Sequence, residues 1–357
     1  MKKLDWYILK KFLGTFVFVV LGLLAIICVI DFTEKNDDFI ENQVSGDLIG
    51  LYYLTFIPFI ASLLTPITVF IATVFVTAKM AAQTEIIAIL ASGVSFKRLM
   101  LPYFIGAILI AGSSFYLNSY VIPDTNKFRI NFEIEYLGKP FYFSDRNIHF
   151  KIGEEDYIYM DRYNNRREIG YKVTLEKIKD LKLQEKISAS RIEWDTATSK
   201  WSLLNWRKRI LLENGEVFET GNKLDTALNL YPKDFENKER LWETLTMFEL
   251  DDYIALQQSR GADDVQIYQI EKYIRHMQPF GVIVLVFIGL IVSARKSRRG
   301  TGFQIALGFL IAFVFIIMFI LTRAIAEANT MNPVLAVWIP NITFSIVGFL
   351  LYNTVPR

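Results

Sequence analysis

Six long apolar runs constrain this chain more than any other feature of its sequence. A helix needs about 20 consecutive apolar residues to cross the hydrocarbon core of a bilayer, and six segments approach or exceed that length. They are residues 12–32, 51–78, 99–122, 278–294, 302–322 and 334–352. Because 52% of the residues are hydrophobic while 21% are charged, the composition predicts a protein that is part membrane and part aqueous. The net charge of +2 gives no indication of nucleic-acid binding.

The distribution of Lys and Arg predicts how these spans are oriented. The first run is longer than the apolar region of a secretory signal, and DFTEKNDDF follows it instead of a cleavage site, so it is predicted to remain as a span. If all six runs cross the membrane, the basic loops fall on one side, and cytoplasmic loops are the ones rich in Lys and Arg. Both termini are therefore predicted to be cytoplasmic. The basic residues are Lys2, Lys3, Lys10, Lys11, Lys79, Lys97, Arg98, Arg295, Lys296, Arg298, Arg299 and Arg357. The cluster from Arg295 to Arg299 is interpreted as a topology determinant and a contact for anionic lipids.

The same topology sends one large insert, residues 123–277, to the outer face. Its segments alternate apolar and polar residues, which predicts half-buried strands in an antiparallel sandwich or open barrel. The strand-like segments are NIHFKI, DYIYMDRY, YKVTLEKI, KISASRIEW, KWSLLNW and RILLENGEVFET. The charged stretch TLEKIKDLKLQEKISAS is compatible with either strand or partial helix. The predicted fold is a polytopic α-helical membrane protein with six helices, three on each side of an inserted all-β domain. The predicted domains are 1–122 (with a connecting helix at about 80–92), 123–260 and 261–357.

Motifs for bound nucleotides, metals and nucleophilic catalysis are missing from the sequence. It contains no GxxxxGK[ST] phosphate loop and no GxSxG nucleophile setting. The only two histidines, His149 and His276, have no partner at metal-ligand spacing, and Cys28 is the only cysteine. The sequence therefore predicts no catalytic residue, no metal site and no cofactor in this chain, which is not expected to be an enzyme by itself.

The segment AKMAAQTEIIAILASGVSFKRL joins the second and third spans and predicts a short amphipathic helix. Ile86, Ile89 and Leu90 share one helical face, while Glu85 lies outside it. Gly93 suits a left-handed helix end, and the serine two residues later suits the start of the next helix. Such a helix is either a surface that another protein grips to move the flanking spans, or an interfacial helix that rests on lipid headgroups. These residues alone leave both interpretations open.

Four segments in the same order carry a resemblance to a known family. They are TEIIAILASGVSFKRLMLP, RIEWDTATSKWSLLNW, MFELDDYIALQQSRGADDVQIYQIEKYIRHMQP and ARKSRRGTG. The chain resembles the LptF/LptG permeases, the membrane subunits of the ABC transporter that extracts lipopolysaccharide from the bacterial inner membrane. In the first segment, Glu85, Ala91 and Gly93 occupy the places of the family's coupling-helix glutamate and A-x-G pattern.

The resemblance implies a set of partners and a location. It implies that a second permease of the family pairs with this chain and that a cytoplasmic ABC ATPase dimer, which binds ATP and Mg, receives Glu85 in a groove. It also implies an inner-membrane protein whose periplasmic domain is jelly-roll-like and joins edge to edge with a periplasmic jelly-roll bridge protein. Lipopolysaccharide would leave through a cavity between the two permeases, whose walls involve the first and fifth spans. Membrane lipids are further expected partners.

Two cations near the outer ends of these spans are candidates for the phosphates of the lipid headgroup. Lys35 follows the first span, and Arg323 lies at the end of the fifth. The alternatives are that Lys35 pairs with the nearby Glu34 and Asp37, and that Arg323 snorkels toward the membrane surface or pairs with Glu327.

Two other functions are compatible with the sequence. One is a subunit of a different ABC-type lipid or lipoprotein exporter, although the large insert in those proteins usually follows the first span and not the third. The other is a membrane scaffold or sensor whose outer β domain binds a partner. The scaffold hypothesis predicts no dependence on Glu85.

Overall fold

The protein folds into a helical unit and a β unit. The computed structural model describes residues 2–138, 146–164, 167–180, 182–196, 198–212, 215–235, 240–260, 265–294 and 301–353. The helical unit comprises Met1–Leu137, Trp242–Leu250 and Gln266–Arg357, and the β unit comprises Gly138–Leu241 and Asp251–Val265. The basic cluster at residues 295–299 lies outside the described residues.

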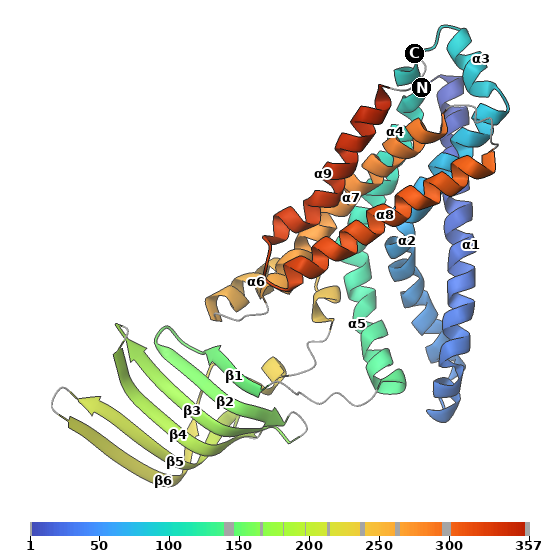
Figure 1. The fold of residues 1–357 in the computed structure, drawn as a ribbon. Coiled ribbons are helices and arrows are strands. Elements are labelled where there is room, and N and C mark those ends of the chain that lie inside the picture. The colour runs from blue at the N-terminus through green and yellow to red at the C-terminus, as the bar shows by residue number, and fades with distance from the viewer. Residues whose placement is uncertain are drawn as a thin grey trace. The chain divides into compact units, whose positions relative to one another are not determined.

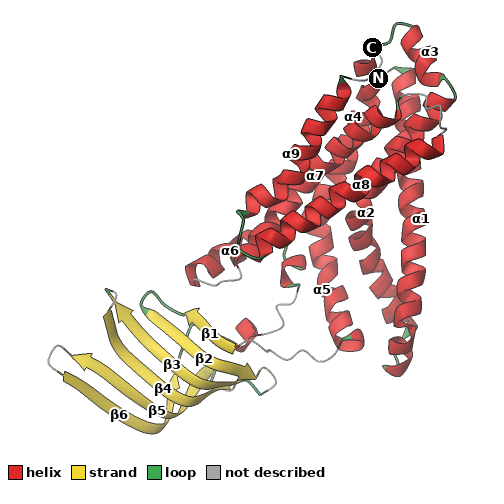
Figure 2. Ribbon diagram, in the orientation of Figure 1, coloured by secondary structure: helices red, strands yellow, loops and turns green. Residues whose placement is uncertain are grey.

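Within the described residues, the helical unit has six helices that are long and apolar enough to cross a membrane, as the sequence predicts (Figures 1 and 2). They are α1 (Lys3–Glu41), α2 (Gly46–Ala82), the continuous stretch Phe96–Leu137 that begins with α4, α7 (Val265–Ser293), α8 (Thr301–Glu327) and α9 (Pro333–Tyr352). The short helix α3 (Glu85–Ala91) joins α2 to α4. Figure 1 places α3, the N-terminal end of α1 and the C-terminal end of α9 together, and this is called the α3 end of the unit.

The third span continues past residue 122, where the sequence analysis ended the first domain. Its parts are α4 (Phe96–Tyr116), the π-helix η1 (Leu117–Val121), α5 (Ile122–Phe132) and a second π-helix η2 (Glu133–Leu137). Pro123 does not end the helix, because it lies in the first turn of α5, just after the π-helical segment. A proline is tolerated there, since the hydrogen-bond register already changes at the π-turn.

A neighbouring helix satisfies the backbone where a proline interrupts α2. Pro66 has no N–H, so the carbonyl of Ser62 four residues earlier loses its usual donor in the helix. The Gln278 Nε2 on α7 donates to that carbonyl at 3.2 Å. Asn118 on η1 donates to the Gln278 side chain at 3.0 Å and accepts from the Ser62 hydroxyl at 2.6 Å. These polar contacts tie α2, η1 and α7 together inside the bundle.

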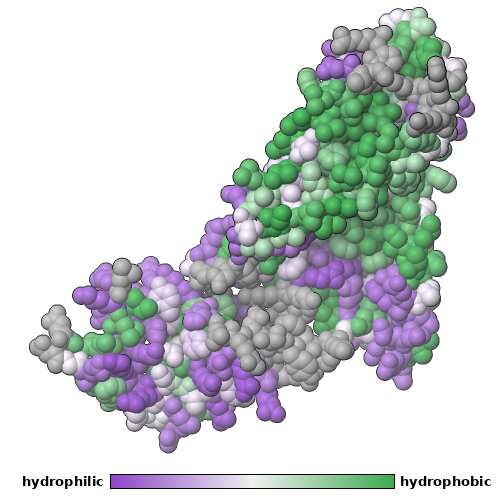
Figure 3. All heavy atoms as spheres, viewed as in Figure 1, coloured by the Kyte–Doolittle hydropathy of each residue, from purple (hydrophilic) through white to green (hydrophobic). Residues whose placement is uncertain are grey.

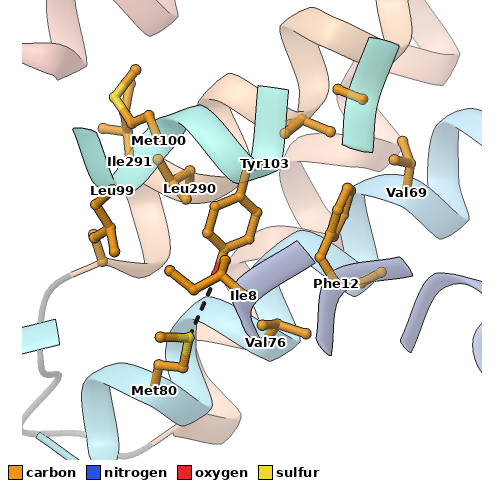
Figure 4. Packing of buried hydrophobic residues seen from close by; sticks show 14 of the residues in the cluster. Ile8, Phe12, Val69, Val76, Met80, Leu99, Met100, Tyr103, Leu290 and Ile291 are labelled. Carbon is orange, nitrogen blue, oxygen red and sulfur yellow. Dashed lines mark hydrogen bonds between the residues drawn. The ribbon is translucent and has the colours of Figure 1, made fainter. Parts of the chain in front are cut away.

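The largest cluster of buried apolar residues given for the described part of the chain lies where α1, α2, α4 and α7 meet (Figure 4). Phe12 of α1 and Tyr103 of α4 pack with ring centroids 5.5 Å apart. Gly106 allows this approach, because a Cβ at that position would lie 2.6 Å from the Phe12 ring. The outward faces of the helices remain apolar, as Figure 3 shows in green, and this is the surface expected against lipid.

The β unit contains one six-stranded antiparallel sheet in which each strand pairs with the next along the chain. The strands are β1 (Arg146–Lys151), β2 (Asp156–Asn164), β3 (Ile169–Lys179), β4 (Lys182–Asp195), β5 (Lys200–Leu212) and β6 (Gly215–Thr226). The ambiguous segment TLEKIKDLKLQEKISAS therefore forms the strand pair β3 and β4. Within the described residues there is one sheet, which is compatible with the expected open barrel, whereas the other expected form, a sandwich, requires two sheets. Alternation of apolar residues fixes which face of a strand is buried, but it cannot tell one sheet from two.

One face of the sheet carries the core of the β unit. Trp201 is fully buried, and its Nε1 donates to the Leu230 carbonyl at 2.7 Å. Tyr163 stacks on Phe235 with centroids 3.9 Å apart, so the segment after β6 covers this face. Short 3-10 turns at Pro232–Phe235 and Leu241–Glu243 and the helix α6 (Met247–Arg260) follow, and the division between the two units falls within α6.

Candidate functional site

The connecting helix α3 is shorter than predicted, because left-handed residues limit it on both sides. Thr84 has φ +60 and separates α3 from α2, so α3 has seven residues, about two turns, where a helix over about 80–92 was expected. Gly93 has φ +85 just past its end, which confirms the predicted left-handed position. Ser95 occupies the N-cap of α4, but its side chain makes no capping hydrogen bond there.

The predicted apolar face of α3 packs on protein. Ile86 is buried, and Ile89 and Leu90 are partly buried against the core cluster that Figure 4 shows. Ile87 and Ala91 are exposed. Because α3 is anchored in the helical core, a force applied to its exposed side acts on the bundle beneath it.

Glu85 links α3 to α1. The Lys11 ammonium donates to both Glu85 oxygens, at 3.2 and 3.3 Å, and the Tyr7 hydroxyl donates to Oε2 at 3.1 Å. Lys11 also lies over the Tyr7 ring, 4.3 Å from its centroid. Glu85 and Lys11 remain partly exposed, with 27% and 33% of their side-chain surface accessible. The sequence analysis missed this link, because it treated Lys11 only as a topology signal. The available clue was the i, i+4 spacing of Tyr7 and Lys11.

A second ion pair holds the start of α1 to α4. Arg98 Nη2 contacts Asp5 Oδ2 at 2.6 Å, and the backbone N–H of Lys2 donates to the same oxygen at 2.7 Å. Only 3% of the Asp5 side-chain surface is exposed, so its charge depends on these partners. The first turns of α1 are thus bonded to the helices on both sides of the Gly93 turn.

At the opposite end of the unit, Lys35 is already bonded. Its ammonium lies 2.6 Å from Asp31 Oδ1 and 2.6 Å from the Tyr52 hydroxyl. The predicted alternative partners, Glu34 and Asp37, were wrong, since the carboxylate one turn earlier on α1 is the one that faces Lys35. This contact connects α1 to α2.

A buried arginine extends the same network to α5. The Tyr52 hydroxyl donates to Glu133 at 3.3 Å, and Arg129 donates to Glu133 at 2.9 Å. Arg129 is 1% exposed and also contacts Glu243 at 2.9 Å, while its guanidinium lies over the Phe59 ring. A polar chain therefore runs from α1 to the segment at Glu243, which follows the β strands in the sequence.

A second buried arginine holds that same segment from α7. Arg275 is 3% exposed, and its guanidinium donates to the carbonyls of Trp242 at 2.7 Å and Leu245 at 2.6 Å. Its Nε also contacts Glu271 at 3.1 Å. The segment between residues 242 and 245 is therefore fixed to α5 by Arg129 and to α7 by Arg275. The sequence analysis missed both arginines, since their partners are mostly distant in sequence.

The start of α6 adds a second contact to α5. The Thr246 backbone N–H and hydroxyl both donate to Glu249 at 2.8 Å, which is a capping arrangement. The backbone N–H of Thr246, its hydroxyl and the nearby Lys127 ammonium hold the pKa of Glu249 below its usual value, despite some burial. Lys127 of α5 lies 3.3 Å from Glu249.

Arg323 lies near the C-terminal end of α8 and pairs with Glu327. The Arg323 Nε donates to Glu327 Oε1 at 2.7 Å, which is the alternative that the sequence analysis named. Lys35 and Arg323 thus have separate carboxylate partners on separate helices, and they share no hydrogen-bonded group. The headgroup contacts expected of them stay predictions.

The fold and these contacts define a class of protein: a multi-pass helical membrane protein with a β domain inserted between its third and fourth spans. The chain matches the family described as lipopolysaccharide export system permease LptF/LptG over residues 6–354. The protein belongs to this family. No curated protein matches the chain at a significant level.

Proposed function

We propose that this chain is a permease subunit of an ABC transporter that extracts lipopolysaccharide from the inner membrane. The observation that carries the proposal is membership of the LptF/LptG family over residues 6–354. In this proposal the chain performs no chemistry itself. A cytoplasmic ATPase dimer with bound ATP and Mg supplies the energy, and a second permease of the family completes the path for the lipid.

The α3 end faces the cytoplasm in this proposal. Basic residues at the start of α1, the end of α2 and the start of α4 lie at this end, where positive charge favours the cytoplasmic side. The position of the N-terminal end of α1 beside the C-terminal end of α9 supports an even number of crossings. The β unit then belongs to the periplasm.

The ATPase grips α3 and moves the spans through it. The exposed Ile87 and Ala91 offer a contact surface, and Gly93 allows the sharp turn that follows. Two features of the contacts support this role over a helix that merely rests on lipid. The opposite face of α3 is seated in the core through Ile86, and Glu85 is bonded to α1.

The β unit receives the lipid and passes it to the periplasmic bridge. Strands β1 and β6 are the edges of the described sheet, since each pairs with a single neighbour. Side chains of β6 are largely exposed, including Val217 and Phe218. An open edge of this kind is competent to add a strand from another sheet.

Lys35 and Arg323 contact the phosphates of the headgroup. Lys35 uses two of its three N–H groups on Asp31 and Tyr52, and within the described residues only the Nε of Arg323 is bonded, to Glu327. Both cations therefore retain donors for a phosphate. Arg323→Gln should slow lipopolysaccharide release, whereas the control Glu327→Gln, which keeps the cation, should not. Equal rates in both variants would contradict the assignment.

Copurification and lipid release test the function as a whole. The full chain is purified with its ATPase from cells that make lipopolysaccharide. Release of the bound lipopolysaccharide into buffer that contains the bridge protein but no proteoliposomes is then measured in the presence of ATP. Wild type should release lipid only with ATP, and Glu85→Ala should lose ATPase copurification or release. The scaffold hypothesis predicts no effect of either ATP or Glu85. Release of lipoprotein in place of lipopolysaccharide would identify the other exporter class.

A further inference from the structure

A groove on the outward side of α1 lies next to the Glu85 link. It has a volume of about 460 Å³ and is lined by Tyr7, Lys10, Lys11, Gly14, Thr15 and Phe18 of α1 and by Phe75 of α2. The α1 residues recur every three or four positions, so they form one stripe along the helix. This surface is called the α1 groove. Tyr7 and Lys11 also belong to the Glu85 link, whereas the rest of the lining has no part in the proposed function.

The groups in the α1 groove change in a regular order along the helix. Tyr7 lies nearest the α3 end, Lys10 and Lys11 come next, then Gly14 and Thr15, and the exposed Phe18 ring follows. At 1.5 Å per residue, the lysines and Phe18 are about 12 Å apart along the helix axis. That length covers the headgroup layer of one leaflet and enters its hydrocarbon.

The centre of the groove is open because of glycine. A Cβ placed on Gly14 would meet no atom within 4 Å, so the notch belongs to the surface and not to the packing of the bundle. Phe18 and Phe75 stand beyond it, and both rings are substantially exposed. A flexible hydrocarbon chain fits such a notch between rings.

The positive charge of Lys10 indicates which kind of molecule the groove binds. Among the described residues, no carboxylate lies within ion-pair distance of the exposed Lys10 ammonium, whereas the Lys11 ammonium is held by Glu85. We propose that the α1 groove binds an anionic phospholipid of the inner leaflet, with the phosphate on Lys10 and an acyl chain between Phe18 and Phe75. The placement of this phosphate in the inner leaflet rests on the proposed function, in which the α3 end faces the cytoplasm.

Such a lipid lies directly beside the link between α1 and α3. Lys11 is a wall of the groove and also the donor to both Glu85 oxygens. A bound phosphate next to Lys10 adds negative charge within reach of Lys11, so the lipid and Glu85 compete for the same ammonium. The anionic lipid in the groove therefore regulates the strength of the Lys11–Glu85 bond between α1 and α3.

Native mass spectrometry of the purified full transporter tests the proposal with phosphatidylglycerol and phosphatidylcholine as probes. Lys10→Gln should weaken phosphatidylglycerol binding about fivefold, which corresponds to about 1 kcal/mol for one lysine near a membrane surface. Gly14→Leu fills the notch and should displace the lipid. The controls are Lys3→Gln, an exposed lysine of the same helix, and Gly22→Leu, whose Cβ also meets no atom within 4 Å.

The outcomes separate this proposal from its alternatives. Selective loss of phosphatidylglycerol in Lys10→Gln and Gly14→Leu, with both controls unchanged, supports it. Equal loss in test and control variants, or equal binding of the two lipids, overturns it. If Gly14→Leu leaves lipid binding unchanged but releases a membrane protein from the complex, a partner helix occupies the groove and the lipid site is wrong. Lipid binding is measured without ATP, so these results stand whether or not the chain exports lipopolysaccharide.

Discussion

Replacing Lys11 with methionine separates two roles of Glu85 that are combined in the native protein. In the proposed function, the Glu85 helix docks on the ATPase, while the structure shows the Glu85 carboxylate bonded to α1. Lys11→Met keeps the aliphatic stem and the Glu85 carboxylate but removes the ammonium between them. We expect this variant to bind the ATPase normally and to release less lipid for each ATP hydrolysed.

The geometry sets the size of the effect. Partly exposed ion pairs contribute about 0.2–1 kcal/mol, and a cation over an aromatic ring adds about 0.5–1 kcal/mol. The Lys11 ammonium makes both contacts, to Glu85 at 3.2 Å and to the Tyr7 ring at 4.3 Å. The contact with Tyr7 cancels in a cycle on positions 11 and 85, so their coupling energy comes from the ion pair and should be about 0.2–1 kcal/mol, at most a factor of about five in an equilibrium between linked and unlinked α3.

A double-mutant cycle measures that coupling. Lys11→Met, Glu85→Gln and the double variant are compared with wild type for thermal stability, ATPase affinity and lipid release per ATP, with Lys3→Met as the charge control. The two single changes should be non-additive in stability and in release, but only Glu85→Gln should weaken ATPase affinity. Normal release by Lys11→Met would refute the reasoning. So would a loss of ATPase affinity in Lys11→Met equal to that in Glu85→Gln.

Three further changes test the packing around these elements. Arg98→Leu removes the guanidinium from the buried Asp5 carboxylate and should lower the free energy of unfolding by about 2–3 kcal/mol in detergent; a loss below about 0.5 kcal/mol would contradict the ion-pair assignment. Gly93→Ala should cost about 1 kcal/mol, since its φ of +85 strains any residue with a Cβ, and an asparagine there should cost less in the same melting experiment. Trp201→Phe leaves the Leu230 carbonyl without its donor and should cost about 1–3 kcal/mol, seen as faster hydrogen exchange in β5; unchanged exchange would argue against this bond.

Local patterns in the sequence were enough to predict the elements of this fold. An apolar run of about 20 residues in a membrane protein forms a spanning helix, because its backbone groups must be hydrogen-bonded within the run, so all six helices were predicted. Alternation predicted the strands, and Gly93 indicated the turn after α3, because these signals act within a few residues. The continuation of the third span through Pro123 was missed, since a proline usually marks a helix boundary and the π-turn before it leaves no signal in the sequence.

The ion pairs of the candidate site could not be predicted in the same way. Lys11 and Glu85 are 74 residues apart, and Arg129 and Glu243 are 114 apart, so their pairing depends on how the helices pack. Each charged residue also had several acceptable partners nearby in the sequence, as Lys35 had in Glu34. Only the rotation of each helix in the bundle selects one of them, and a span that is apolar on all sides does not reveal that rotation as an amphipathic helix does.

These contacts give α1 a different mechanical character from its neighbours. Near its start it is bonded to α4 through Asp5 and to α3 through Lys11, and near its other end Lys35 bonds it to α2. Of the 18 consecutive residues that make up the apolar stretch of α1, only 6% are buried. The 39 residues of α1 form one helix about 58 Å long without a proline. An α-helix without a proline keeps its backbone hydrogen bonds unbroken, so it transmits a displacement along its axis better than a kinked helix does. In the proposed transporter, movement of α3 therefore reaches Lys35, and the polar contacts that Lys35 makes with α2, through α1. The two prolines of α2 make that helix less suited to transmit the same movement.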